Sequence, residues 1–105
     1  MLGLFKNMFG GSDSQQLSET IKDGAYLVDV RTPGEFAHGS VKGAINIPLN
    51  SLPQKLAQFK GKKNIVVFCQ SGGRSGMAKQ ILEQNGFSNT INGGGWRQVD
   101  RVMKG

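Results

Sequence analysis

The chain has 105 residues, which is enough for one domain with its own hydrophobic core and too few for a second domain. Apolar residues make up 37% and occur along the whole chain, which excludes a disordered protein. A single cysteine and a single histidine exclude a disulfide framework and a cysteine-based metal cluster. The formal net charge of +6 comes from scattered lysines and arginines without a nucleic-acid motif, so we interpret it as solvated surface charge that also attracts small anions.

The first eleven residues, MLGLFKNMFGG, are apolar with one charge, Lys6. They lack the basic leader and the cleavage site of a signal peptide, and they are too short to span a membrane. We therefore expect residues 1–12 to be an N-terminal extension, flexible or loosely packed, and residues 13–105 to form the domain. A lone cysteine suits a reducing compartment, so we predict a cytoplasmic protein. The apolar residues of the extension could pack on the domain or touch a membrane surface, and we favour packing or fraying over membrane contact.

The domain begins with a helical pattern followed by a strand pattern. A helix is predicted over residues 13–23, where Leu17 and Ile21 share a face and Gly24 provides a stop. The run 26–30 is nearly continuously apolar, which is typical of a strand that is covered on both faces.

Two capping-box patterns follow, one at residues 32–35 and one at Ser51 and Gln54. The first predicts a short helix that ends near Gly39. Between the two patterns, residues 44–47 resemble a short strand closed by a proline. The second pattern predicts a helix whose apolar face consists of Leu52, Leu56 and Phe59.

The second half of the domain again alternates strand and helix. Residues 64–68 form an apolar, β-branched run that predicts a buried strand. Residues 88–91 predict a weak strand, and glycines 93–95 predict a turn. A helix is predicted between these two strands, with a face of Met77, Ala78, Ile81 and Leu82. A second helix is predicted after the glycines, with a face of Trp96, Val99 and Met103. This alternation predicts an α/β domain of three layers, with a mostly parallel sheet of four to five strands and helices on both faces.

The only cysteine lies at the carboxyl end of the predicted strand 64–68, where parallel α/β sheets bind ligands. It opens a turn into a helix, and the backbone N–H groups of such a turn converge on an anion. The same field favours a thiolate, so we expect a lowered pKa for Cys69. An inert thiol in the core is the alternative interpretation. The turn consists of Cys69, Gln70, Ser71, Gly72, Gly73, Arg74 and Ser75.

This turn resembles the active-site loop of the rhodanese family of sulfurtransferases, which often places four residues between a cysteine and an arginine. Related phosphatases place five residues there, and the wider cradle accommodates a phosphate. Three further segments resemble family motifs in the same order. They are Leu27 to Arg31, Glu35 to Pro48, and the glycine motif Ile91 to Trp96.

Some departures from the family pattern affect local packing but leave the Cys69 loop intact. Members of the family often have Gly-His-Ile where this chain has Gly39-Ser40-Val41. Some members also begin with a strand before the first helix, for which residues 10–14 are a poor candidate.

The resemblance implies that Cys69 takes a sulfane sulfur from thiosulfate or a similar anionic donor and holds it as a persulfide. Cyanide or a thiol, including a protein thiol, would then accept the sulfur. No metal, organic cofactor or nucleic acid is implied. Substrate contacts are expected from Gln70, Ser71, Gly72, Gly73, Arg74 and Ser75. Structural support is expected from Asp29, Arg31 and Glu35, with a charge pair between Arg31 and Glu35.

Other functions remain open at this stage. A phosphatase conflicts with the four-residue spacing, and an arsenate reductase that relays thiols conflicts with the single cysteine. A non-catalytic sulfur carrier or partner-docking module is the other alternative. We interpret His38 as a surface residue and Trp96 as an aromatic side chain of the core or of a pocket rim. The sequence does not predict an oligomeric state.

Overall fold

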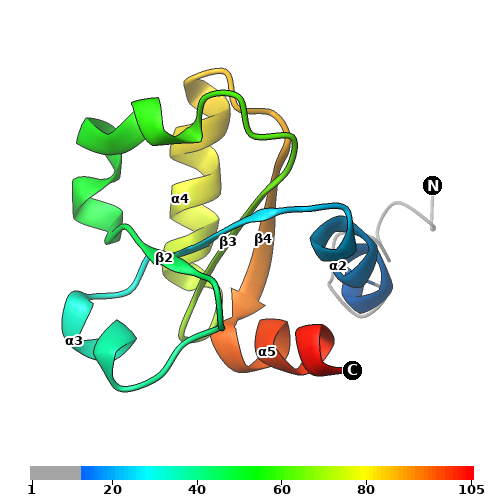
Figure 1. Ribbon diagram of the computed structural model, residues 1–105. Helices are drawn as coiled ribbons and strands as arrows, with labels where there is room; N and C mark the ends of the chain where they lie inside the picture. The colour runs from blue at the N-terminus through cyan, green and yellow to red at the C-terminus, as the bar shows by residue number, and fades with distance from the viewer. Residues whose placement is uncertain (1–12) are drawn as a thin grey trace.

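The computed structural model describes residues 13–105, which fold around a four-stranded sheet in the order β2-β1-β3-β4 (Figure 1). Every neighbouring pair of strands is parallel, which confirms the predicted α/β class. The extension predicted for residues 1–12 lies outside the described residues. The strands are β1 (Tyr26–Asp29), β2 (Ile45–Asn46), β3 (Ile65–Cys69) and β4 (Thr90–Gly95).

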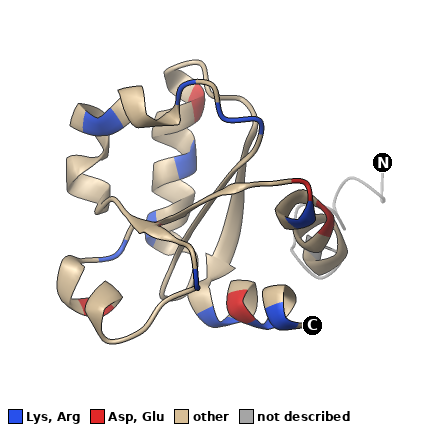
Figure 2. Cartoon of the chain, viewed as in Figure 1, with Lys and Arg blue, Asp and Glu red and all other residues tan. Residues whose placement is uncertain are grey.

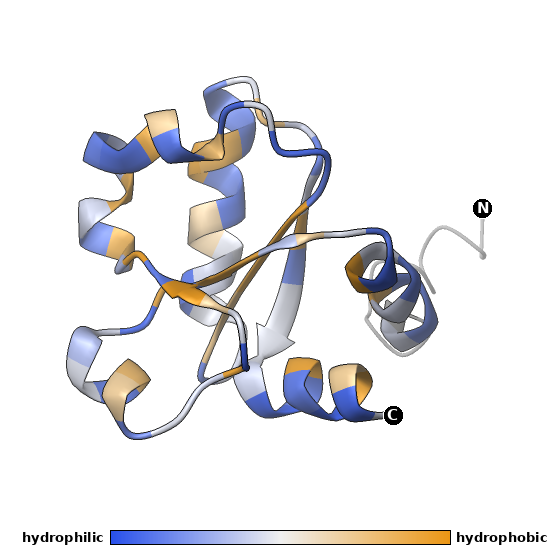
Figure 3. Cartoon of the chain, in the orientation of Figure 1, coloured by the Kyte–Doolittle hydropathy of each residue, from blue (hydrophilic) through white to orange (hydrophobic). Residues whose placement is uncertain are grey.

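Helices cover both faces of the sheet, and each face carries its own hydrophobic cluster (Figures 1 and 3). One face packs against η1 and α4, and the opposite face packs against α2 and α5. A short helix, α3, follows β1. The helices are α2 (Asp13–Lys22), α3 (Pro33–Ala37), the 3₁₀ helix η1 (Leu49–Phe59), α4 (Gly73–Gln84) and α5 (Trp96–Lys104).

Strand β3 lies inside the sheet, and all five of its residues are buried. Successive side chains of a strand point to opposite faces. Val66 and Phe68 therefore belong to the cluster under α2 and α5, whereas Val67 and Cys69 belong to the cluster under η1 and α4. This alternation places the sulfur of Cys69 on the side from which α4 starts.

The capping box predicted at residues 32–35 is present: Thr32 accepts from the backbone N–H of Glu35, whose carboxylate accepts from the N–H of Thr32. The second capping box, at Ser51 and Gln54, is wrong. That helix is a 3₁₀ helix from Leu49 onward, and its first turn has no side-chain cap. Pro53 removes a backbone donor inside it, and Lys55 leaves helical geometry. The predicted apolar face still packs inward, with Leu52 and Phe59 buried.

Two further expectations need correction. Met77 is 56% exposed and does not belong to the buried face of α4, whereas Ala78 and Leu82 are buried as predicted. Glycines 93–95 do not form a turn, because β4 continues through Gly95 after a register shift opposite Val67 and Phe68. Close packing explains Gly95 and Gly93, since an added Cβ would lie 2.8 Å from the backbone oxygen of Gln70 and 2.9 Å from the side chain of Val99, respectively. Gly94 instead adopts a φ of 82°, which favours glycine.

Basic residues occur on several elements and do not gather on one face (Figure 2). This distribution agrees with the interpretation of the net charge as solvated surface charge. Among the helices of residues 13–105, none combines the length and the apolar character that a membrane crossing requires.

Candidate active site

Cys69 ends β3, and the loop that follows folds back over its sulfur. The backbone N–H of Gly72 donates to Sγ at 3.0 Å, and the N–H of Ser75 donates at 3.4 Å. The loop can make this tight approach because Gly72 adopts a φ of 106°, which is in the left-handed region that favours glycine. Helix α4 starts at the next residue, so the sulfur lies at a helix N-terminus.

These contacts determine how readily the thiol ionises. Burial raises the pKa of Cys69, because a charged sulfur loses hydration. Hydrogen bonds to the sulfur lower the pKa. The Ser75 hydroxyl contributes when it donates to the sulfur, and the backbone N–H groups of Ser75, Ser71 and Gly72 also contribute. The donors prevail, and the pKa of Cys69 lies below its ordinary value of 9.0. A lowered pKa is the property that a cysteine nucleophile needs.

Ser75 contacts the sulfur from the buried side of the loop. Its residue is fully buried, and its Oγ lies 3.4 Å from Sγ of Cys69. The same hydroxyl donates a 2.6 Å hydrogen bond to Oδ1 of Asn92 on β4. Sequence reasoning did not single out Asn92 as a site residue. Its position in the predicted glycine motif was the only available signal.

The outer side of the loop faces solvent. Gln70, Ser71 and Gly73 are exposed, and Gly72 is half-buried. The structure therefore separates the predicted loop residues into two groups, a solvent-facing rim and a buried layer under the sulfur.

Arg74 lies on the first turn of α4 and forms an ion pair with Glu35 of α3. Its two terminal nitrogens contact the two carboxylate oxygens at 2.7 and 3.0 Å. This contact, followed by the hydrogen bond from the backbone of Thr32, lowers the pKa of Glu35 from 4.5 to about 2. The predicted pair between Arg31 and Glu35 is wrong, because Glu35 bonds to Arg74.

Arg31 pairs with Asp29 instead, and both side chains are buried. The closest contact joins Nη2 of Arg31 to Oδ2 of Asp29 at 2.7 Å. Arg31 also donates to the backbone oxygen of Gly39, and Ser40 donates to Asp29. The pair thus fastens the segment after α3 to the end of β1, which is the position expected of structural support.

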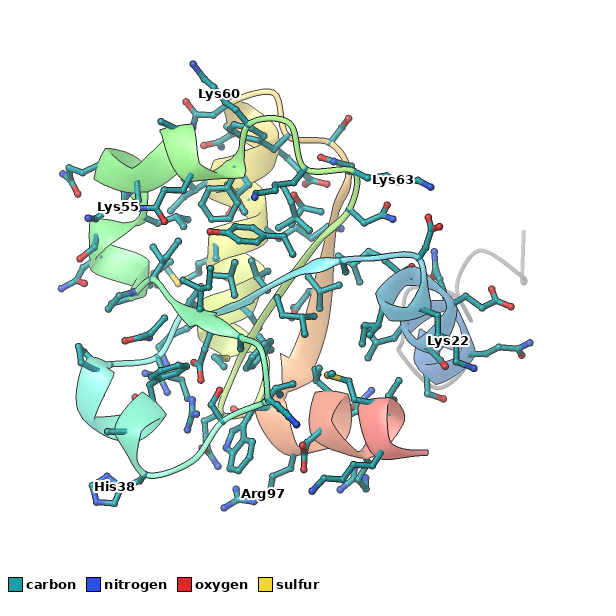
Figure 4. All side chains as sticks on the ribbon, viewed as in Figure 1. Lys22, His38, Lys55, Lys60, Lys63 and Arg97 are labelled. Carbon is teal, nitrogen blue, oxygen red and sulfur yellow. The ribbon has the colours of Figure 1, made fainter. Side chains whose placement is uncertain are left out.

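A shallow groove of about 420 Å³ opens beside the Cys69 loop. The ring of Trp96 lies near the guanidinium groups of Arg31 and Arg97, whose central carbons are 5.1 and 4.7 Å from the ring centre. Both labelled side chains at this end, His38 and Arg97, extend outward in Figure 4. The ring of His38 bonds to the carbonyl of Gly34 in its own helix. The groove is lined by Arg31, Gly34, Glu35, His38, Gly39, Gln70, Trp96 and Arg97.

A larger polar hollow of about 1130 Å³ follows β4 between α2 and α4. It includes Ser71 and Gly72 but extends away from the loop toward Asn64 and Ser88. Both hollows therefore border the Cys69 loop, and the smaller one also includes Glu35, the partner of Arg74.

Comparison with known proteins agrees with this geometry. A family model described as "Rhodanese-like domain" matches residues 13–101. The thiosulfate sulfurtransferase PspE of Escherichia coli is 38% identical over 76 residues, which cover 70% of this chain and 73% of that protein.

Two solved structures are similar in both fold and sequence. A rhodanese with anions from E. coli has a TM-score of 0.65 at 36% identity, covering 71% of this chain and 91% of that one. The human single-domain sulfurtransferase TSTD1 has a TM-score of 0.68 at 30% identity, covering 87% of this chain and 93% of that one. With its fold, its loop and the family match in agreement, the chain belongs to the family of rhodanese-like domains.

Proposed function

We propose that this chain is a sulfurtransferase that carries a sulfane sulfur on Cys69. The observation that supports this most directly is the convergence of the Gly72 and Ser75 N–H groups on the sulfur of the only cysteine. That arrangement stabilises a thiolate and later the negative charge on a transferred sulfur. A neighbouring base is not required when the surrounding donors already favour ionisation.

In the donor step, the Cys69 thiolate attacks the outer sulfur of an anionic donor such as thiosulfate. A new S–S bond forms to Cys69, and the S–S bond of the donor breaks. Sulfite leaves with the bonding electron pair, and the protein holds a persulfide. The similarity to a thiosulfate sulfurtransferase and to a rhodanese solved with anions supports this donor class.

In the acceptor step, a thiolate or cyanide attacks the outer sulfur of the persulfide. The S–S bond to Cys69 breaks, its electron pair returns to Cys69, and the thiolate is regenerated. Two separate half-reactions of this kind give ping-pong kinetics. Neither half-reaction, as proposed, requires a cofactor.

We assign Arg74 to the donor step. Its guanidinium lies at the rim of the loop, with 37% of the side chain exposed and with Glu35 as its partner. A planar guanidinium suits the oxygen atoms of thiosulfate, and it can contact them while it remains bound to Glu35. Asp29 and Arg31 hold the backbone around this region and do not contact the reacting sulfur.

Intact mass spectrometry tests the proposal directly. Incubation with thiosulfate should add one sulfur atom, about 32 Da, to the protein, and a reducing thiol should remove it. The Cys69→Ser variant is the matched control and should acquire no sulfur. An unchanged mass of the native protein, with excess thiosulfate and no acceptor, would contradict the persulfide mechanism.

A steady-state assay then separates an enzyme from a sulfur carrier. An enzyme should produce many equivalents of thiocyanate from thiosulfate and cyanide. A carrier should load one sulfur per chain and release it slowly.

A further inference from the structure

The buried hydroxyl of Ser75 has two possible hydrogen-bond acceptors and one proton to donate. The acceptors are the sulfur of Cys69 at 3.4 Å and Oδ1 of Asn92 at 2.6 Å. Because Ser75 is fully buried, solvent does not provide a third partner. The hydroxyl can donate a hydrogen bond to only one of the two acceptors at a time.

The orientation of the Asn92 amide decides which acceptor the Ser75 hydroxyl donates to. Oδ1 of Asn92 accepts from the backbone N–H of Gly94 at 2.9 Å, and Nδ2 donates to the carbonyl of Gly72 at 3.2 Å. If the amide were reversed, its NH₂ group would face the N–H of Gly94 and its oxygen would face the carbonyl of Gly72, so both hydrogen bonds would be lost. Oδ1 must therefore face Ser75, and the short contact between two oxygens requires the hydroxyl to donate.

We propose that Asn92 is a positioning residue: it accepts the hydrogen bond of the Ser75 hydroxyl, so that this hydroxyl does not donate to the sulfur of Cys69. In the resting protein the thiol S–H then donates to Oγ of Ser75, which accepts it. When the thiol ionises, the hydroxyl must either remain with Asn92 or rotate and give up its 2.6 Å hydrogen bond. While the hydroxyl stays with Asn92, the thiolate depends on the backbone N–H donors of the loop, and those of Gly72 and Ser75 lie 3.0 and 3.4 Å from the sulfur.

This role has a chemical consequence for the nucleophile. A thiolate that receives every available hydrogen bond ionises more easily but attacks more weakly, because nucleophilicity falls with pKa. By removing one donor, Asn92 keeps the sulfur more basic than its loop alone would make it. The inference rests on Cys69 being the nucleophile and does not depend on which sulfur donor the protein uses.

Charged groups also influence this sulfur. Arg74 of α4 is the cation that interacts with Cys69, and Glu35 of α3 and Asp29 at the end of β1 interact with that arginine in turn. These charges stay the same in all variants of the experiment, so their effects cancel in the comparison.

A double-mutant cycle on the thiol pKa tests the proposal. Cys69 is the only cysteine, so thiolate absorbance in the ultraviolet, with Cys69→Ser as the blank, reports this one group. In the native background, Ser75→Ala should not raise the pKa of Cys69, because the hydroxyl does not donate to the sulfur. In the Asn92→Ala background the hydroxyl is released, and there Ser75→Ala should raise the pKa by about one unit.

Comparison within each background removes the effect of the lost contact between Asn92 and Gly72. Asn85→Ala serves as the matched control, because its amide bonds to the carbonyl of Ile81 at the far end of α4. This control should leave the pKa unchanged. Ser75→Thr, which retains a hydroxyl, should reproduce the native value.

Two results would overturn the proposal. One is an increase of equal size on Ser75→Ala in both backgrounds, which would mean that the hydroxyl already donates to the sulfur. The other is the absence of any increase in the Asn92→Ala background. If Asn92→Ala does not fold, Ser75→Ala alone still decides, since an increase of about one unit in the native background contradicts the proposal. The titration uses no sulfur donor, so failure of the proposed function leaves its result intact.

Discussion

Arg74 and Glu35 bind each other through two parallel contacts of 2.7 and 3.0 Å, although 39 positions separate them in the chain. The pair joins the first turn of α4 to α3. A bidentate contact fixes the plane of the guanidinium as well as its position. Glu35 thus holds the cation that we assign to the anionic donor.

Arg74→Ala should slow the donor step more than the acceptor step. Thiosulfate is a dianion and its leaving group carries charge, whereas a thiol that attacks the finished persulfide depends less on this cation. Because the side chain is 37% exposed, we expect roughly 10- to 100-fold slowing of the donor step. Stopped-flow measurement of the two half-reactions checks this, and Arg74→Lys should restore only part of the rate. Equal slowing of both steps would show that Arg74 shapes the loop instead.

The contribution of Glu35 to stability should depend on pH. Its pKa is lowered in the folded protein from 4.5 to about 2, so the folded state favours the ionised form. The resulting stability is fully present above about pH 4.5 and decreases as the pH falls toward 2. Urea unfolding of the native protein and of Glu35→Gln at several pH values measures it. Their difference should shrink across this window, and a constant difference would contradict the assignment.

Gly95→Ala should disturb the active-site loop. The added Cβ would lie 2.8 Å from the backbone oxygen of Gln70, so the loop must shift. We expect a loss of about 1–3 kcal/mol in the free energy of unfolding and a slower donor step. Gly34→Ala is the control, because nothing lies within 4 Å of its added Cβ. Crystal structures or amide NMR shifts of both variants would show whether the loop moves only in the first.

Asp29→Asn should be strongly destabilising. The substitution leaves the guanidinium of Arg31 buried without its counter-charge, and breaking a buried pair in this way costs about 3–5 kcal/mol. Asp23→Asn removes a carboxylate from the exposed pair with Lys63, and we expect little change there. Denaturant unfolding compares the two. Similar losses would mean that burial does not determine the value of the Asp29 pair.

Local patterns were sufficient to predict the sheet and the Cys69 loop. The apolar run of β3 has no polar interruption, and the loop residues are contiguous, so their neighbours in space are also neighbours in sequence. Residues 32–35 were predictable for the same reason, since both halves of a capping box lie within one helical turn.

The partners of charged groups could not be predicted in this way. Arg31 lies four positions before Glu35 and is a reasonable partner by spacing, but it pairs with Asp29, two positions before it in the chain. Glu35 pairs with Arg74, which the fold brings to it from 39 positions away. Asn92 was missed for a related reason. Its contact with Ser75 depends on the register of β4 against β3, and this register shifts just beyond Asn92. Neither the shift nor the contact has a sequence signal.

The position of Trp96 provides a measurable signal at the groove. It is the only tryptophan of the chain, and its ring lines the groove beside the Cys69 loop. Excitation of indole therefore reports one location, and with two guanidinium groups near the ring we expect its emission to respond to a bound anion. We therefore expect the proposed loading of sulfur and entry of an acceptor to change the intrinsic fluorescence, which would follow both steps in real time without a label.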